Sequence, residues 1–179
     1  CTGGAAEGLR AMGVAAVSVG PGIEIAGRRE AVGVVAIISP WNFPMATAAW
    51  KIAPALAFGN AVIWKPANLT PASAVALTEI IAQQDIPAGL FNLLMGSGSV
   101  LGDGLTAHPG VDAVSFTGSV DVGRKVAMQA ASHFAKVQLE MGSKNALLVM
   151  DDADLDLAVQ TAANGAFGST GQKCTASSR

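Results

Sequence analysis

Cys174 lies in the segment STGQKCTASSR, residues 169–179, and is one of only two cysteines in this 179-residue sequence. A lone cysteine is most often a small buried apolar residue, but its thiolate is also a strong nucleophile. Glu140 and Asn42 would supply the other groups that acyl chemistry on a thiol needs. A partly buried carboxylate suits general-base work, and an amide held in the stiff segment SPWNFP, 39–44, could donate to an oxyanion.

Each of these two residues also has a simpler interpretation. Glu140 could cap a helix or lie at the surface, and the Asn42 side chain could close an Asx turn. The combination of a thiol, an amide donor and a carboxylate is what favours a catalytic site over separate structural roles.

Glycine-rich turns and one lysine point to a nucleotide. In FTGSVDVG, 116–123, Gly118 and Ser119 precede a predicted helix, whose N-terminal amides attract phosphate. MGSGSVLGDG, 95–104, would let a nucleotide approach the backbone closely, and Lys65 could reach ribose hydroxyls or a phosphate. The alternatives are a βα turn with Ser119 as N-cap, a flexible turn, and a solvated lysine at a strand end.

Short β-rich runs alternate with helical runs after Gly33, which predicts βαβ units and a mostly parallel sheet. Ligands bind such sheets at the carboxyl ends of the strands. Thr70, as N-cap, with Pro71 marks one helix start, another helix is expected to be capped near Asp152, and Pro54 should bend the first helix. The expected strands are 32–39, 60–65, 90–95, 112–116, 136–140 and 145–150, and the expected helices are 45–59, 70–84, 119–132 and 152–171, with a short helix after 90–95.

Residues 14–32 alternate around a Gly-Pro-Gly turn, which predicts an antiparallel hairpin that leaves the main sheet. An extended hairpin with nothing to pack on suggests an oligomer contact. Residues 1–13 resemble the tail of a helix. The fold class is therefore α/β, with an open, mostly parallel Rossmann-like sheet and a protruding antiparallel hairpin.

The composition excludes several other functions. A formal net charge of −2 gives no reason to expect nucleic acid or an anionic membrane. The uncharged stretch 31–50 is long enough to raise the question of a membrane span, but its prolines and Asn42 favour a strand, a turn and a helix. Two cysteines make no disulfide framework, so a reducing cytoplasm is expected. No secretory signal is evident, and both ends suggest a piece of a longer protein.

Five ordered blocks identify a family. SPWNFP (39–44), KPANLTP (65–71), FTGSVDVG (116–123), LEMGSKN (139–145) and GQKCTASSR (171–179) resemble those of the NAD(P)-dependent aldehyde dehydrogenase superfamily. Together, STGQKCTASSR and KVQLEMGSKN look most like its 2-oxoglutarate semialdehyde dehydrogenase branch.

The resemblance implies oxidation of an aldehyde, through a thiohemiacetal and a thioester on the nucleophile Cys174. It implies that Asn42 and the Cys174 backbone N–H form an oxyanion hole, that Glu140 activates water, and that Lys51 relays protons. Trp41 and Ser39 would line the cofactor channel, Lys65 would bind the adenosine ribose, and Gly118 and Ser119 would meet the pyrophosphate. No metal site is assigned. The full set of expected cofactor-binding residues is Ile38, Ser39, Pro40, Trp41, Lys65, Ala67, Asn68, Gly98, Phe116, Thr117, Gly118, Ser119, Gly123, Met141 and Gly142.

Two departures from the family pattern matter. Asn68 stands where many NAD-preferring members have a glutamate that would repel a 2′-phosphate, so NADP is expected to be accepted as well as NAD. Ser143 replaces the second glycine of a Gly-Gly pair, which bears on the position of Glu140. The alternatives are a CoA-acylating or otherwise non-hydrolytic semialdehyde dehydrogenase, and a non-catalytic nucleotide-binding relative.

The resemblance also implies a domain plan and an assembly. Residues 1–13 would be the tail of a nucleotide-domain helix, 14–32 an oligomerisation hairpin, 33–141 the NAD(P)-binding domain, and 142–179 the start of a second, catalytic α/β domain. The substrate-pocket residues would lie beyond this sequence, so the chain should not complete an active site by itself. The intact protein is expected to be a homo-oligomer, a dimer or tetramer.

Overall fold

The structure, a computed structural model, describes residues 6, 10 and 13–179. The expected helix tail at 1–13 falls mostly outside these residues. The described chain contains a five-stranded sheet with the strand order β5-β4-β3-β6-β7 and a separate two-stranded hairpin, β1-β2. The α/β class, the parallel sheet and the hairpin are therefore confirmed.

Every neighbouring pair in the five-stranded sheet is parallel. The central strand β3 is apolar and β-branched (VVAII), as expected for a strand buried on both faces. Parallel strands bring their carboxyl ends to one edge, so the segments after the strands lie together. The strands are β3 (Val34–Ile38), β4 (Ala61–Lys65), β5 (Phe91–Leu93), β6 (Ala113–Gly118) and β7 (Lys136–Met141).

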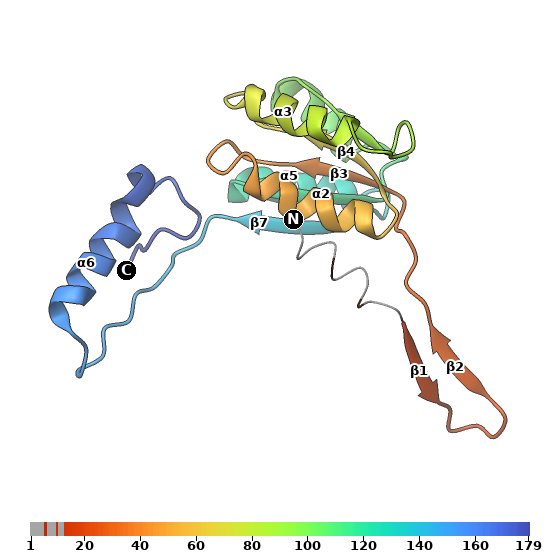
Figure 1. The fold of residues 1–179 in the computed structure, drawn as a ribbon, viewed down its shortest axis with the longest axis horizontal. Coiled ribbons are helices and arrows are strands. Elements are labelled where there is room, and N and C mark those ends of the chain that lie inside the picture. The colour runs from red at the N-terminus through yellow and green to blue at the C-terminus, as the bar shows by residue number, and fades with distance from the viewer. Residues whose placement is uncertain (1–5, 7–9, 11–12) are drawn as a thin grey trace.

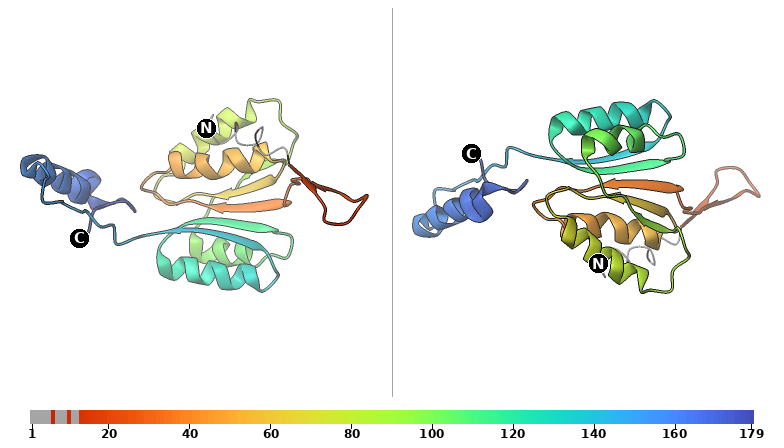
Figure 2. Two further views of the ribbon diagram at one scale, coloured as in Figure 1. Left: turned by 90° about the horizontal axis from the view of Figure 1, so that it is seen from below. Right: turned by 90° about the horizontal axis from the view of Figure 1, so that it is seen from above.

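Helices cover both faces of the sheet (Figure 2). On one face lie α2 (Ala46–Ala57) and α3 (Pro71–Ala82), which pack on a cluster around the fully buried Trp64. On the other lie the one-turn η1 (Gly98–Gly102), α4 (Asp103–Thr106) and α5 (Val120–Ala131), and residues of α4 and α5 pack in a second cluster around Phe116. The sheet is therefore the middle layer of three.

The start of α3 differs in detail from the prediction. Pro71 does occupy the first turn, where its missing N–H costs nothing. Thr70 stands at the N-cap, but its side chain makes no capping hydrogen bond, and its buried hydroxyl has no partner among the described residues. The predicted N-cap position is confirmed, but the hydroxyl does not cap the helix, because the backbone at Thr70 (φ −132°, ψ 52°) is not in the extended conformation usual for a capping residue.

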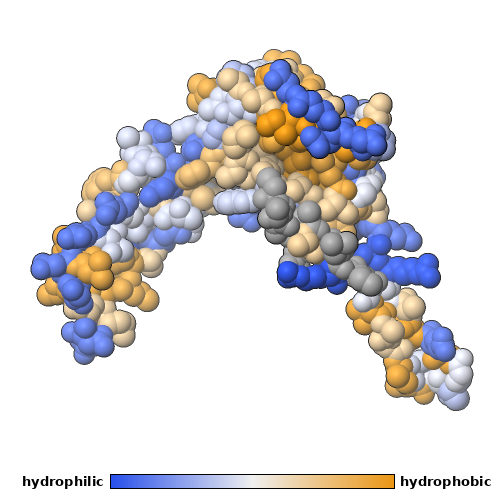
Figure 3. All heavy atoms as spheres, viewed as in Figure 1, coloured by the Kyte–Doolittle hydropathy of each residue, from blue (hydrophilic) through white to orange (hydrophobic). Residues whose placement is uncertain are grey.

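The hairpin of β1 (Val14–Val17) and β2 (Glu24–Gly27) projects from the sheet (Figure 1). All residues of both strands are exposed, although several are large and apolar. Figure 3 shows these apolar side chains on the projecting arm. A two-stranded hairpin is at best marginally stable in water without further packing.

One buried amide ties the base of this hairpin to the sheet. Asn60 is 5% exposed, and its Oδ1 accepts from the backbone N–H of Val32 at 2.6 Å and of Gly33 at 3.1 Å. Its Nδ2 donates to the carbonyl of Ala55 at 3.0 Å. Asn60 therefore links the exit of the hairpin to both α2 and β4.

The last part of the chain leaves β7 as an extended segment and returns through a helix (Figure 1). The strand expected at 145–150 is wrong: only an isolated parallel bridge joins Asn145 to Ser177, because the returning segment meets it over too short a stretch for a ladder. The helix is α6 (Leu155–Phe167), followed by the single turn η2 (Gly168–Gly171).

The start and end of α6 also differ from the expected range of 152–171. Asp154, not Asp152, is the N-cap, because its Oδ1 accepts from the N–H of Leu157 at 3.1 Å. The α-helix stops at Phe167, since Gly168 has extended backbone (φ −54°, ψ 135°). Among the described helices, none combines the length and apolarity needed to cross a bilayer.

Candidate active site

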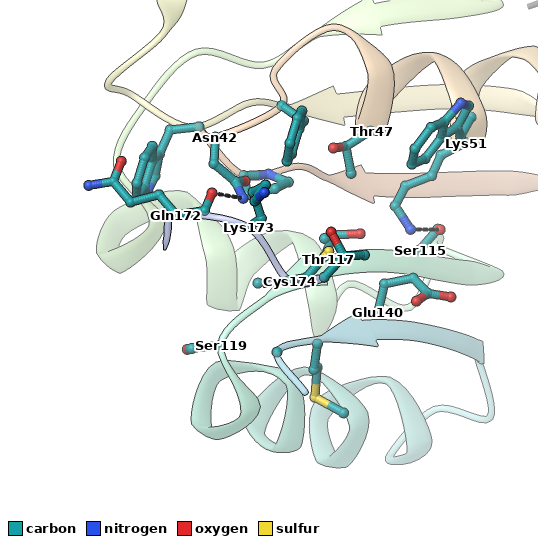
Figure 4. A pocket seen from close by; sticks show the side chains of 18 of the residues that line it. Asn42, Thr47, Lys51, Ser115, Thr117, Ser119, Glu140, Gln172, Lys173 and Cys174 are labelled. Carbon is teal, nitrogen blue, oxygen red and sulfur yellow. Dashed lines mark hydrogen bonds between the residues drawn. The ribbon is translucent and has the colours of Figure 1, made fainter. Parts of the chain in front are cut away.

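A cavity of about 1000 Å³ opens at the carboxyl edge of the sheet. Its walls come from the segment after β3, from α2, from β6 and β7, and from the segment that follows η2. The last segment places Cys174 at the carboxyl edge of the sheet, beside the cavity (Figure 4). The cavity thus joins residues far apart in the sequence.

Cys174 is exposed and free, so the interpretation as a buried apolar residue is wrong. Its segment is held by Asn145, whose Nδ2 donates to the carbonyl of Cys174 at 2.6 Å and to that of Ala176 at 3.1 Å. The N–H of Ser178 in turn donates to the Asn145 carbonyl at 2.9 Å. One asparagine therefore fixes the backbone around the thiol from the β7 side.

Asn42 reaches the same segment from the opposite side. Its Nδ2 donates to the carbonyl of Gln172 at 2.9 Å (Figure 4), and no Asx-turn bond to its Oδ1 is found among the described residues. An amide nitrogen has two hydrogens, so a second donor remains beside the pocket.

Glu140 lines the cavity from the end of β7. It is exposed, so the partial burial considered from the sequence is not found. In the sheet, Ser115 pairs with Gln138 and Thr117 pairs with Glu140. Alternate residues of a strand share a face, so these four polar side chains project together toward α2.

Lys51 of α2 meets this polar face from above (Figure 4). Its Nζ donates to Ser115 Oγ at 2.9 Å and to Gln138 Oε1 at 2.8 Å, with the carbonyl of Phe116 at 3.5 Å. Burial lowers the pKa of Lys51 from 10.5 to about 8, and the nearby Glu140 carboxylate acts in the opposite direction. A lysine of this kind can gain or lose a proton near neutral pH.

The turn from β6 to α5 fits an anionic group. Thr117 has a hydroxyl that is buried at the pocket wall with no partner among the described residues. Ser119 is the N-cap of α5, yet its side chain makes no capping hydrogen bond, so its hydroxyl does not occupy the first backbone N–H groups of the helix. Gly118 allows the close approach of the Phe116 ring, since a Cβ there would lie 2.5 Å from it. These residues fit a cofactor pyrophosphate.

Lys65 lies further along the same edge. It is 5% exposed, so it is not the solvated lysine that one alternative proposed. Its Nζ donates to the carbonyls of Pro66 at 3.0 Å and Gly96 at 3.2 Å, and burial lowers its pKa. The Lys65 stem also lies 4.0 Å from the place of a Cβ on Gly98, which brings the predicted glycine-rich turn beside it.

The structure gathers more than half of the sequence-predicted site residues around the cavity. Those that line it are Asn42, Lys51, Glu140, Cys174, Pro40, Trp41, Thr117, Gly118, Ser119, Met141 and Gly142. The others lie outside its lining, at the ends of neighbouring strands or just beneath the edge: Ile38, Ser39, Lys65, Ala67, Asn68, Gly98, Phe116 and Gly123.

Some of the residues outside the lining have structural contacts. Ser39 is buried and accepts from the indole N–H of Trp64 at 2.8 Å. Gly123 is buried in the first turn of α5, where a Cβ would lie 2.5 Å from the sulfur of Met141. Both residues therefore support the packing beneath the carboxyl edge of the sheet.

Sequence reasoning missed three polar residues of the site: Ser115, Gln138 and Asn145. The first two had a signal, because the two-residue period of a strand places Gln138 on the same face as Glu140 and Ser115 on the same face as Thr117. Asn145 had none, since its partners are backbone carbonyls about thirty residues away along the chain.

The arrangement supplies a nucleophilic thiol, an amide donor, a carboxylate and a lysine around one cavity, next to a helix N-terminus. Those are the parts needed to attack a carbonyl, stabilise the resulting oxyanion and activate water.

Comparison with known proteins agrees with this chemistry. The chain is 48% identical over 175 residues to an alpha-ketoglutaric semialdehyde dehydrogenase of Bacillus subtilis, which covers 98% of this chain and 36% of that protein. It is 45% identical to a 2,5-dioxopentanoate dehydrogenase of Saccharolobus solfataricus, which covers 90% of this chain and 34% of that protein. The chain therefore spans about a third of the length of these curated relatives.

Solved structures give the same result. A betaine aldehyde dehydrogenase from Staphylococcus aureus in complex with NAD+ superposes with a TM-score of 0.93 at 40% identity, over 97% of this chain and 34% of that one. An NADP-dependent enzyme of E. coli superposes with a TM-score of 0.93 at 41% identity, over 97% of this chain and 36% of that one. The model of the aldehyde dehydrogenase family matches residues 3–179, and the chain therefore belongs to that family.

Proposed function

We propose that the complete polypeptide carrying this sequence oxidises an aldehyde to a carboxylate with NAD(P)+, by way of a thioester on Cys174. The observation that carries the proposal is the single cavity shared by the exposed Cys174, the Asn42 amide, the Glu140 carboxylate and Lys51. The names of the two curated relatives support an oxo-acid semialdehyde as the substrate class.

In the proposed reaction the Cys174 thiolate bonds to the aldehyde carbon, and the carbonyl π electrons move onto oxygen. Asn42 Nδ2 and the Cys174 N–H donate to this oxyanion. The sheet edge would hold NAD(P)+, which would supply the acceptor for the hydride that leaves the carbon as the C–O⁻ electrons re-form the carbonyl of a thioester on Cys174. Glu140 then takes a proton from water, whose oxygen displaces the thiolate from the thioester and gives the carboxylate.

The cofactor site is proposed to lie along the carboxyl edge, with the pyrophosphate at Thr117, Gly118 and Ser119 and the adenosine ribose near Lys65. Asn68 is exposed and neutral at this end, so its side chain does not repel a 2′-phosphate. We therefore propose that NADP is accepted as well as NAD. A preference for NAD of more than tenfold in kcat/KM would contradict this, and Asn68→Glu should shift preference toward NAD.

The domain plan is proposed on the same grounds. Residues 33–141 would form the NAD(P)-binding part, 142–179 the start of the catalytic part, and 14–32 a contact between subunits of a dimer or tetramer. The exposed apolar side chains of the hairpin support the last point.

The test is aldehyde-dependent NAD(P)H formation by the complete polypeptide, with and without CoA. Formation without CoA, together with its loss in Cys174→Ala, is the expected result. A strict requirement for CoA would favour an acylating enzyme, in which a hydrolytic base is unnecessary. No formation under either condition would favour a non-catalytic relative.

A further inference from the structure

Gln138 joins Lys51 to Glu140. Its Nε2 donates to Glu140 Oε1 at 2.9 Å, while its Oε1 accepts from Lys51 Nζ at 2.8 Å and from Ser115 Oγ at 2.6 Å. The lysine and the serine also contact each other at 2.9 Å. All four side chains line the same cavity.

The orientation of the Gln138 amide is fixed by these neighbours. An ammonium group can only donate, so the oxygen of the amide must face Lys51. A flipped amide would turn its NH₂ toward the Lys51 ammonium and its oxygen toward the Glu140 carboxylate, and both contacts would be repulsive. While Lys51 is protonated, the amide nitrogen therefore points at Glu140.

The sheet explains why these residues meet. Gln138 and Glu140 are two residues apart on β7, so they share a face, and Ser115 is the direct partner of Gln138 on β6. Glu140 is exposed, and Gln138 Nε2 is the side-chain donor that the described residues place on its carboxylate. Without that bond the Glu140 side chain would be free to change rotamer at the mouth of the pocket.

We propose that Gln138 is a positioning residue, which holds the Glu140 carboxylate toward the thioester and is itself oriented by Lys51 and Ser115. The inference rests on the proposed function, because it assigns Glu140 as the base that activates water. It predicts that removal of the Gln138 amide slows thioester hydrolysis and spares the earlier hydride step.

The experiment uses the complete polypeptide and follows NAD(P)H after rapid mixing with aldehyde and cofactor. Gln138→Leu should keep a burst of about one equivalent of NAD(P)H per site, followed by a steady state slowed on the order of tenfold, a fraction of what general-base catalysis contributes. The matched control is Gln84→Leu, since Gln84 is exposed and its side chain donates to the carbonyl of Ile80 in α3.

A second variant covers the case in which Gln138→Leu does not fold. Gln138→Glu can still accept from Lys51 and Ser115, but it presents a negative charge to Glu140 in place of a donor. The acid limb of the pH–kcat profile should then move to higher pH, by on the order of one unit, because the like charge disfavours ionised Glu140. The other titratable groups at this cavity are Lys51, Lys173 and Cys174.

The outcomes separate the claims. Steady-state rates within twofold of the unsubstituted protein for Gln138→Leu, an unmoved acid limb for Gln138→Glu, or loss of the burst in step with turnover would each overturn the role of Gln138. A lack of aldehyde-dependent NAD(P)H from the unsubstituted protein would instead overturn the proposed function, and this inference with it.

Discussion

Lys51 carries a titratable charge at the wall of the cavity, where burial opposes its ionisation. Its pKa falls from 10.5 to about 8, with desolvation as the main cause and Glu140 acting against it. Unfolding returns the amine to water and to its ordinary pKa. Between about pH 8 and 10.5 the unfolded chain therefore binds more protons than the folded chain, so the contribution of Lys51 to stability rises with pH in that window.

Lys51→Met removes this titration and should change the pH dependence of stability. As pH rises from about 8 toward 10.5, the unsubstituted chain should gain free energy of unfolding relative to the Lys51→Met chain. Urea unfolding of both chains at a series of pH values measures the difference. Lys144→Met is the control, because Lys144 is exposed. If the free energies of unfolding of the unsubstituted and Lys51→Met chains change in parallel between about pH 8 and 10.5, burial does not lower the pKa of Lys51.

At the scale of elements, the junction between the hairpin and the sheet depends on Asn60. This buried side chain bonds two backbone N–H groups and one carbonyl, so its loss would leave three buried or partly buried polar groups without their partner. Gly33 lies at the same junction with φ +128°, a conformation that favours glycine. The start of β3 is thus specified by side-chain and backbone constraints together.

Asn60→Ala should lower the free energy of unfolding of this chain by about 2–3 kcal/mol, since each unsatisfied buried group costs about 1–3 kcal/mol. Asn92→Ala is the matched control: Asn92 is exposed and also donates to two carbonyls, so its loss should cost under about 1 kcal/mol. Denaturant unfolding gives both values. Equal costs for the two substitutions would remove the special role of Asn60.

The elements also show how far sequence reasoning reaches. The strands of the parallel sheet could be predicted because each is a β-rich run between helical runs, and their shared edge brought Asn42 and Glu140 to one cavity. Cys174, which its chemistry connected with them, and Lys51, which only the family resemblance did, line the same cavity. The strand expected at 145–150 failed because strand formation depends on a partner, which an apolar run does not reveal. The cap expected near Asp152 falls on Asp154, because three aspartates compete there and only the fold selects among them.

Contacts set by side-chain length and tertiary packing were out of reach. Nothing in the spacing indicates that the hydroxyl of Thr70 lacks a partner, or that Ser39 is buried under Trp64. The hydrogen bond between Gln138 and Lys51 joins β7 to α2, so it depends on how closely α2 packs on the sheet.

At the scale of the whole molecule, large apolar side chains remain exposed at its two extremities (Figure 3). On the hairpin, Val14 is 68% and Ile25 49% exposed. Ala16 lies opposite Ile25 and is two residues from Val14 on the same strand, so Val14 and Ile25 share one face of the hairpin. On the C-terminal part, no residue of α6 is buried. Surfaces of this kind are normally covered in the working protein.

The hairpin is expected to be covered by another subunit, so the complete polypeptide should be a dimer or tetramer in light scattering coupled to size exclusion. Ile25→Lys should shift it to a smaller species, because it places a charge on the apolar face. Glu24→Gln changes the net charge by the same amount on the opposite face and should not. A monomeric unsubstituted protein, or an unchanged assembly for Ile25→Lys, would contradict this.

A thioester on Cys174 can be trapped and located by mass spectrometry. The complete polypeptide with Glu140→Gln is mixed with aldehyde and NAD(P)+, quenched in acid and digested with trypsin, which cuts after Lys173 and Arg179. We expect an acyl adduct on the peptide of residues 174–179, together with about one equivalent of NAD(P)H per site. Formation of NAD(P)H with that peptide unmodified would contradict it.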